Sequence, residues 1–340
     1  MRYVDMKLTK AGMELANTLY DGNGRVLLGK GTVLTNEYIT KLNKRGFIGV
    51  YIQDELSEDI VINEIISPEL RNKGVKALKT KNLDMARSVA IEIVDEILSS
   101  PVVTLEMVDL RNFDDCTYRH SVNVAVISTI VGINMGMNRF MLEELSIAAI
   151  LHDIGKMLIS SDIINKPGKL TDEEFDIIKE HPRLGYDFLS EKMDISARIR
   201  TSILSHHENE DGTGYPNGMT GKSIYVYAKV IHVADVFDAL TSRRPYKQPF
   251  SRLEAVEYLM GACDRLFDRH VVVAFLRSVT IYPKGTVVTL SDGRVGMTIS
   301  SGVNSLRPVV RLANKEEIDL NDMNLYRNVT IKEDCVKQIQ

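Results

Sequence analysis

The stretch LSIAAILHDIGKMLIS, residues 145–160, decides the fold class of this chain of 340 residues. Apolar residues recur at helical spacing from Leu142 to Ala149, and the predicted helix runs directly into the adjacent pair His152 and Asp153. A lone His-Asp pair is weak evidence of function, because an ordinary helix end can carry the same two polar residues. Whether this pair indicates a functional site therefore depends on the residues that the neighbouring helices supply.

Residues from about 105 to 280 have an almost entirely helical pattern. A helix with one apolar side is expected around His120, and others over residues 195–204 and 228–240. Capping boxes beginning at Thr171 and at Ser251 open two more helices. The chain contains neither GxGxxG nor GxxxxGK[ST], so no nucleotide-binding α/β sheet is indicated.

The two ends of the chain have different patterns. Residues 1–60 combine turn signals, a helix capped by Thr35 and a strand over 48–52, which predicts a small α/β unit. Residues 61–104 are charged and helical from about Ser67 to Ser100, which indicates a connecting helix. Residues 281–340 alternate with period two around an Asp-Gly turn, which predicts a small antiparallel β unit.

Composition excludes several classes of protein. Lys and Arg total 42 against 46 Asp and Glu, a net charge of −4, so no nucleic-acid polymer or membrane surface is expected as partner. The three cysteines form no CxxC pair, which argues against a disulfide framework and a zinc knuckle. Residues 121–138 are uncharged but interrupted by Ser, Thr and Asn, which indicates a buried helix and no membrane span. No signal peptide is evident, and the prediction is a soluble, cytoplasmic protein.

Histidines gather in the helical region. Six of the seven lie between positions 120 and 232, namely His120, His152, His181, His206, His207 and His232. Each alone is more often a structural residue. Five of them together with Asp153 and Asp235, drawn from several helices, are what a two-metal site in a bundle core needs.

These residues also carry a family resemblance. The His152-Asp153 pair, His181, the tandem His206-His207, the loop DGTGYP at 211–216 and the segment VADVFDALTS at 233–242 together resemble the HD-GYP domain. That domain is the branch of the HD metal phosphohydrolases that cleaves cyclic di-GMP. The resemblance covers about residues 105–280 and implies a mainly α fold, an HD-type helical bundle core with the two small end units attached.

The resemblance implies two divalent metal ions, iron or manganese by family habit, with zinc, cobalt and nickel also admitted by the ligand chemistry. Asp153 would bridge the ions, which would hold a hydroxide that attacks the phosphodiester. The implied ligands are His120, His152, Asp153, His181, His206, His207 and Asp235. Three-metal members carry glutamate four residues before the first ligand histidine. Here Cys116 stands at that position, which leaves a third metal in doubt.

Further roles follow from the same resemblance. Lys156 is implied as a catalytic residue that contacts the phosphate or assists the leaving group. Apart from the resemblance, Glu208 and Asp211 flank the tandem histidines and are candidates either to orient imidazole N–H groups or to form an ordinary polar loop. His232 is interpreted as structural. The implied substrate contacts are Gly214, Tyr215, Pro216, Arg244 and Lys247.

The predicted function is therefore a metal-dependent phosphodiesterase that hydrolyses cyclic di-GMP to pGpG, with onward cleavage to GMP left open. One alternative keeps the metal site but acts on another cyclic dinucleotide or a nucleotide. Another is a non-hydrolysing sensor of cyclic di-GMP. The end units are candidates for regulation or dimerisation, so a homodimer is also open.

Overall fold

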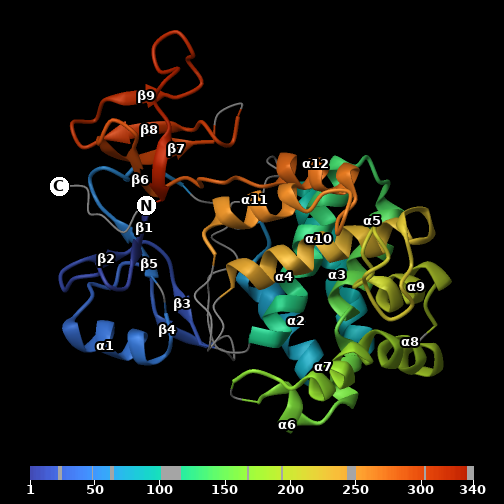
Figure 1. Ribbon diagram of the computed structural model, residues 1–340. Helices are drawn as coiled ribbons and strands as arrows, with labels where there is room; N and C mark the ends of the chain where they lie inside the picture. The colour runs from blue at the N-terminus through green and yellow to red at the C-terminus, as the bar shows by residue number, and fades with distance from the viewer. Residues whose placement is uncertain are drawn as a thin grey trace. The chain divides into compact units, whose positions relative to one another are not determined.

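The computed structural model describes residues 1–21, 25–47, 49–61, 65–100, 116–166, 168–192, 194–242, 250–301 and 304–334. They form two compact units, most of whose helices and strands are labelled in Figure 1. The first unit takes its described residues from both ends of the chain, up to 61 and from 279 onward. The second takes residues 65–100 and 116–278. The division of the sequence at residues 60, 104 and 280 stays a prediction.

The second unit is built of helices. Its α-helices are α2 (Pro68–Lys79), α3 (Leu83–Ser99), α4 (Cys116–Asn134), α5 (Arg139–Leu151), α6 (Ser161–Ile164), α7 (Asp172–Lys179), α8 (His181–Lys192), α9 (Ala197–Ser205), α10 (Val226–Thr241), α11 (Arg252–Gly261) and α12 (Arg269–Ser278). Two short 3-10 helices are η2 (Ile154–Leu158) and η3 (Gly221–Ser223).

Helix α4 is the centre of this unit because residues on every side of it are buried. Val122, Val124, Val126 and Ile127 are each at most 1% exposed. A helix of this kind must be covered by others, and α2, α5, α10 and α12 all pack against it. Among the described residues, no helix has the length and apolarity that crossing a bilayer requires.

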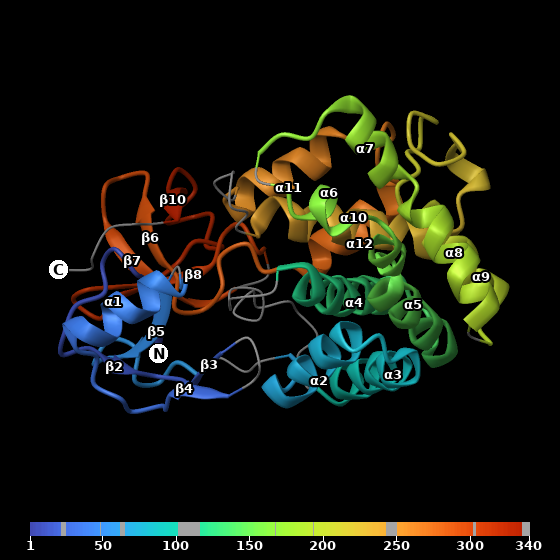
Figure 2. The ribbon, with the colours of Figure 1, turned by 90° about the horizontal axis from the view of Figure 1, so that it is seen from below.

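Two helices stand where the sequence pattern predicts a single connecting helix. Ser67 caps α2, and a break at Lys81, whose φ is 55°, separates α2 from α3. Figure 2 shows the two helices side by side, and they pack against α4 and α5 respectively. Gly74 allows the close approach, because a Cβ there would lie 2.9 Å from a methyl group of Val122. These helices are therefore part of the bundle.

The first unit contains the strands of the two ends of the chain. The N-terminal elements are β1 (Arg2–Asp5), β2 (Glu14–Leu15), β3 (Leu19–Tyr20), β4 (Val26–Leu28), α1 (Asn36–Lys44) and β5 (Gly49–Gln53). The C-terminal elements are β6 (Val287–Leu290), β7 (Val295–Ser300), β8 (Val309–Leu312), β9 (Glu317–Asp319) and β10 (Ile331–Asp334). The strand orders are β1-β5-β2, β3-β4 and β10-β6-β7-β8-β9, all antiparallel. The predicted fold class is confirmed.

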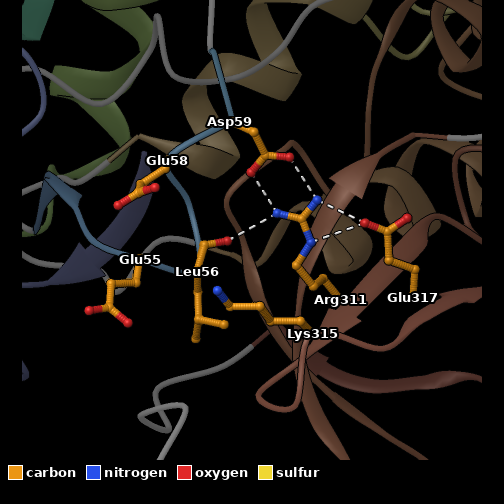
Figure 3. A pocket seen from close by; sticks show the side chains of 7 residues that line it. All are labelled: Glu55, Leu56, Glu58, Asp59, Arg311, Lys315 and Glu317. Atoms are coloured by element: carbon orange, nitrogen blue, oxygen red, sulfur yellow. Dashed lines mark hydrogen bonds and ion pairs between the residues drawn. The ribbon is translucent and has the colours of Figure 1, made fainter.

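Contacts within this unit join residues far apart in the sequence. Met297 of β7 completes an apolar cluster with Tyr51 and Ile60. Arg311 of β8 donates to both carboxylate oxygens of Asp59, at 2.6 and 2.7 Å, and also to Glu317 (Figure 3). These hydrogen bonds lower the pKa of Asp59 to about 2. The two ends of the chain thus share apolar packing and an ion pair.

Candidate metal centre

Three buried histidines stand at helix ends. His152 is the C-cap of α5, His206 is the C-cap of α9, and His181 begins α8 directly after α7. Nδ1 of each ring lies 2.7 Å from the carbonyl oxygen of the residue three positions earlier. The last carbonyls of a helix have no partner inside it, so an imidazole N–H satisfies them. The sequence position of each histidine therefore fixes its ring orientation.

These carbonyl contacts leave unprotonated nitrogens facing inward. A neutral ring that donates through Nδ1 has a bare acceptor at Nε2. The Nε2 atoms of His181 and His206 lie 3.3 Å apart, where neither can donate to the other. Nε2 of His152 is buried and has no hydrogen-bond partner among the described residues. Acceptors that converge without a donor fit a bound cation, so this chemistry suits a divalent metal.

Asp153 belongs to one of two neighbouring groups of candidate ligands. The groups are Asp153, His181, His206 and His207, and then His120, His152 and Asp235, with ligand atoms inside each group within 4.8 Å of one another. Oδ1 of Asp153 lies 3.2 Å from Nε2 of His181. Its Oδ2 lies 3.5 Å from Nε2 of His152 and 4.0 Å from that of His120, both in the other group. One carboxylate oxygen therefore faces each group.

His120 is held by two carboxylates of α10. Its Nε2 lies 2.9 Å from Oδ1 of Asp235, and its Nδ1 lies 2.7 Å from Oδ2 of Asp238. Oδ1 of Asp238 in turn accepts from Nδ2 of Asn123 at 3.0 Å. Asp238 thus fixes the ring so that Nε2 faces Asp235.

Gly155 brings the second helix end to Asp153. A Cβ at this position would lie 1.9 Å from the carbonyl oxygen of His181 and 2.6 Å from the backbone nitrogen of Gly185. The start of α8 therefore packs directly on the backbone that follows Asp153. A side chain larger than hydrogen would separate His181 from the carboxylate.

The surroundings favour the metal-binding protonation states of His206 and Asp153, but not that of His120. Burial, followed by the neighbouring imidazoles, lowers the pKa of His206 well below its ordinary value. Burial opposes ionisation of Asp153, but the Lys156 ammonium and nearby imidazoles hold its pKa well below the usual range. Burial also opposes protonation of His120, yet hydrogen bonds to Asp235 and Asp238 raise its pKa to about 10. His120 must therefore release a proton before Nε2 can bind a metal.

Glu208 braces the loop after the tandem histidines. Its carboxylate accepts the backbone N–H groups of Asn217 and Met219 at 2.7 and 2.8 Å, and the residue is only 2% exposed. The prediction that Glu208 orients an imidazole is therefore wrong, because both oxygens hold the loop. That loop returns Tyr215 to the site, where its ring lies on His207 with centroids 4.7 Å apart and planes at 30°.

Two neighbours of Tyr215 also shape the loop. A Cβ at Gly214 would lie 2.3 Å from the backbone nitrogen of Asn209, so the chain has no room for a side chain there. Pro216 follows Tyr215 through a cis peptide bond. Asp211 accepts from the backbone N–H and hydroxyl of Thr213, at 2.9 and 2.6 Å, and is exposed. Its predicted role toward an imidazole is wrong as well.

The seven predicted metal ligands all fall in the two ligand groups. His232 is buried against Phe267, with ring centroids 4.9 Å apart, and burial lowers its pKa to about 4. Arg244 and Lys247 lie outside the described residues, as does the side chain of Cys116. Their predicted roles stay predictions.

Sequence reasoning assigned no role to Asp238 or Asn123. A signal for Asp238 was present, because it follows Asp235 by three residues and so lies on the same face of α10. No pattern marks Asn123, whose contact depends on how α4 and α10 pack.

Comparison with known proteins agrees with this geometry. Residues 107–271 match the model of a family described as HD domain. A cyclic di-GMP phosphodiesterase of Pseudomonas aeruginosa is 39% identical over 228 residues, which are 66% of this chain and 55% of that protein. A cyclic di-GMP phosphodiesterase of Thermotoga maritima is 38% identical over 61% of this chain and 57% of its own length. The chain thus spans about half the length of these relatives.

Two further matches concern substrate and fold. The 3′3′-cGAMP-specific phosphodiesterase 1 of Vibrio cholerae is 31% identical over 56% of this chain and 43% of its own length. Among solved structures, an HDG"Y"P protein from Bdellovibrio bacteriovorus gives a TM-score of 0.51 at 18% identity, covering 80% of this chain and 97% of that one. The second match concerns the fold alone.

Proposed function

We propose that this chain, whose residues 107–271 match the HD domain family, is a metal-dependent phosphodiesterase that hydrolyses cyclic di-GMP to pGpG. The observation that carries the proposal is the pair of ligand groups with Asp153 between them. Relatives from two organisms, each named as a cyclic di-GMP phosphodiesterase, support the choice of substrate.

We propose His120, His152 and Asp235 as ligands of one divalent ion and His181, His206 and His207 as ligands of the other. Asp153 is the ligand shared between them. When bound, two such ions supply the neutralisation of phosphodiester charge and the activation of water at neutral pH. Imidazole and carboxylate ligands without thiolate suit iron or manganese, which we propose as the metals.

The protein's own residues position the substrate and handle its charge. Lys156 carries an ammonium whose side chain is 28% exposed, so it can reach a phosphate oxygen from beside Asp153. Tyr215 presents a phenol ring on His207, and burial raises its pKa, so the ring stays neutral. We propose that Gly214, Tyr215 and Pro216 form the wall on which the dinucleotide rests. Arg244 and Lys247 are proposed as its further phosphate contacts.

Product analysis tests this function directly. Metal-free protein is loaded anaerobically with Fe²⁺ or Mn²⁺ and incubated with cyclic di-GMP, 3′3′-cGAMP or cyclic di-AMP, and the products are separated by chromatography. We expect cyclic di-GMP to be consumed fastest, with pGpG as the first product and any GMP appearing later. Binding of cyclic di-GMP without turnover in every metal-loaded sample would identify a sensor and overturn the proposal.

Another cyclic dinucleotide is the second candidate substrate. The relative specific for 3′3′-cGAMP favours it, because that protein is 31% identical over 196 residues of this chain. A higher kcat/KM for 3′3′-cGAMP than for cyclic di-GMP would decide for this alternative.

A further inference from the structure

Arg71 is a buried arginine of α2, a helix that precedes the residues matched by the HD domain family. The residue is only 6% exposed, and its Nη1 donates to Oδ1 of Asn123 at 2.8 Å. Asn123 lies on α4, one helical turn beyond His120. Arg71 is therefore linked, through Asn123, to the helix that carries the candidate ligand His120.

The contact with Arg71 sets the direction of every following hydrogen bond. A guanidinium only donates, so it selects the oxygen of the Asn123 amide and turns the NH₂ group the opposite way. That NH₂ group donates to Oδ1 of Asp238 at 3.0 Å. Oδ2 of Asp238 faces Nδ1 of His120 at 2.7 Å. The donor at Arg71 thus determines the donor–acceptor order of each hydrogen bond from α2 to His120, a candidate metal ligand.

All the intermediate side chains are buried, which makes the order of these bonds costly to change. Asn123 is 5% exposed and Asp238 is 1% exposed. Inside a protein an unpaired polar group costs about 1–3 kcal/mol, so reversing one amide would leave two groups mispaired. Networks of this kind hold a single arrangement when every member is satisfied.

His120 differs here from the histidines at helix ends. His152, His181 and His206 are oriented by main-chain carbonyls, which no side-chain substitution removes. The Nδ1 of His120 depends on the side chain of Asp238, and Asp238 depends on Asn123. The His120 group is therefore the part of the centre that distant side chains can affect.

We propose that Arg71 is a positioning residue for the ion bound by His120, His152 and Asp235, acting through Asn123 and Asp238. This inference rests on the metal centre of the proposed function and adds α2 to it. The other ligand group, centred on His206, does not depend on Arg71. Helix α2 thereby becomes a working part of the proposed enzyme.

The test measures metal binding and needs no substrate. Metal-free wild type, Arg71→Met, Asn123→Leu and the double variant are titrated with Mn²⁺ by calorimetry, and folding is checked by circular dichroism. We expect Arg71→Met to lower the affinity for one of the two Mn²⁺ ions at least tenfold. Groups that orient a metal ligand typically change metal affinity by about 10–100-fold. The second ion should keep its affinity within about threefold.

Two comparisons separate positioning from general stabilisation. If Arg71 acts through Asn123, the double variant should bind Mn²⁺ no more weakly than Asn123→Leu alone. The reason is that the effects of substitutions at interacting residues do not add. Arg71→Lys, which also only donates, should recover most of the affinity. Arg252→Met makes the same change at an arginine that is 5% exposed on α11, and should leave both affinities unchanged. If Arg71→Met does not fold, Arg71→Gln replaces it, because its neutral amide no longer dictates the direction.

Each outcome decides the inference. Equal weakening of both ions, additive effects in the double variant, or unchanged binding in every Arg71 variant would overturn it. A wild-type chain that binds no Mn²⁺ would overturn it together with the metal centre. A wild-type chain that binds two ions but leaves cyclic di-GMP intact would overturn the substrate alone, and the Arg71 result would still stand.

Discussion

Nζ of Lys156 donates a hydrogen bond of 2.7 Å to Oδ2 of Asp153, the oxygen that also faces His152. The lysine is more exposed than the carboxylate, at 28% against 5% of the side chain. A cation therefore lies on the solvent side of the Asp153 carboxylate. This places positive charge where a phosphodiester would approach the centre.

Lys156→Met should lower hydrolysis of cyclic di-GMP while keeping the metal. The ammonium is no metal ligand, so Mn²⁺ content by elemental analysis should stay close to the wild-type value. Loss of one preorganised charge at a reacting phosphate typically costs about 10²–10³ in kcat. Loss of metal in parallel with activity would contradict the assigned role.

Asp153→Asn should abolish metal binding by both groups and leave the helical fold intact. The amide keeps the shape of the carboxylate but has neither its charge nor a second acceptor oxygen for the other ion. Asp176→Asn, on the exposed side of α7, is the matched control and should bind Mn²⁺ normally. The check is a Mn²⁺ titration beside a far-ultraviolet circular dichroism spectrum. Two tightly bound ions in the Asp153→Asn variant would exclude a shared carboxylate.

Glu208→Gln should raise KM for cyclic di-GMP roughly tenfold and leave metal content unchanged. Both oxygens of Glu208 accept backbone N–H groups, and glutamine would point an NH₂ donor at one of them. An unsatisfied buried donor costs about 1–3 kcal/mol, which loosens the loop that carries Tyr215. Steady-state kinetics measure the effect, with exposed Glu257→Gln as control. An unchanged KM would show that the loop does not contact substrate.

His232 should make the stability of the metal-free protein fall in mild acid. Burial lowers its pKa to about 4, below the ordinary 6.5, so the unfolded state takes up the proton first. This stability is present above pH 6.5 and is lost as the pH falls from 6.5 toward 4. Relative to His232→Leu, the unfolding free energy of wild type should drop by roughly 2 kcal/mol between pH 7 and 5. Urea unfolding of both proteins gives this difference, and parallel pH curves would refute it.

Local signals in the sequence predicted the helical elements well. The capping boxes at Thr171 and Ser251 and the cap at Thr35 all form as expected, because a cap needs only residues within one turn. The ligand residues gathered as predicted because they stand at helix ends or on inward faces of one bundle.

Contacts between distant elements were beyond sequence patterns. The role of Arg71 depends on which face α2 turns to α4, and a charged residue in a helix is usually solvated. The role of Glu208 was predicted wrongly because its carboxylate accepts from backbone N–H groups. Every residue except proline has such a group, so the sequence does not indicate this contact. Alternation of period two predicted an antiparallel β unit near the C-terminus, but could not show that Met297 would pack against Tyr51.

The shared unit formed by the two chain ends has a consequence for synthesis on the ribosome. Residues 65–278 are complete before Met297 and Arg311 have been translated, so the helical unit can fold while the N-terminal strands still lack these partners. Domains usually fold in the order in which they emerge. Here the segment made first is among the last to be finished, and the nascent chain would carry a folded helical unit beside incomplete N-terminal strands until Met297 and Arg311 emerge.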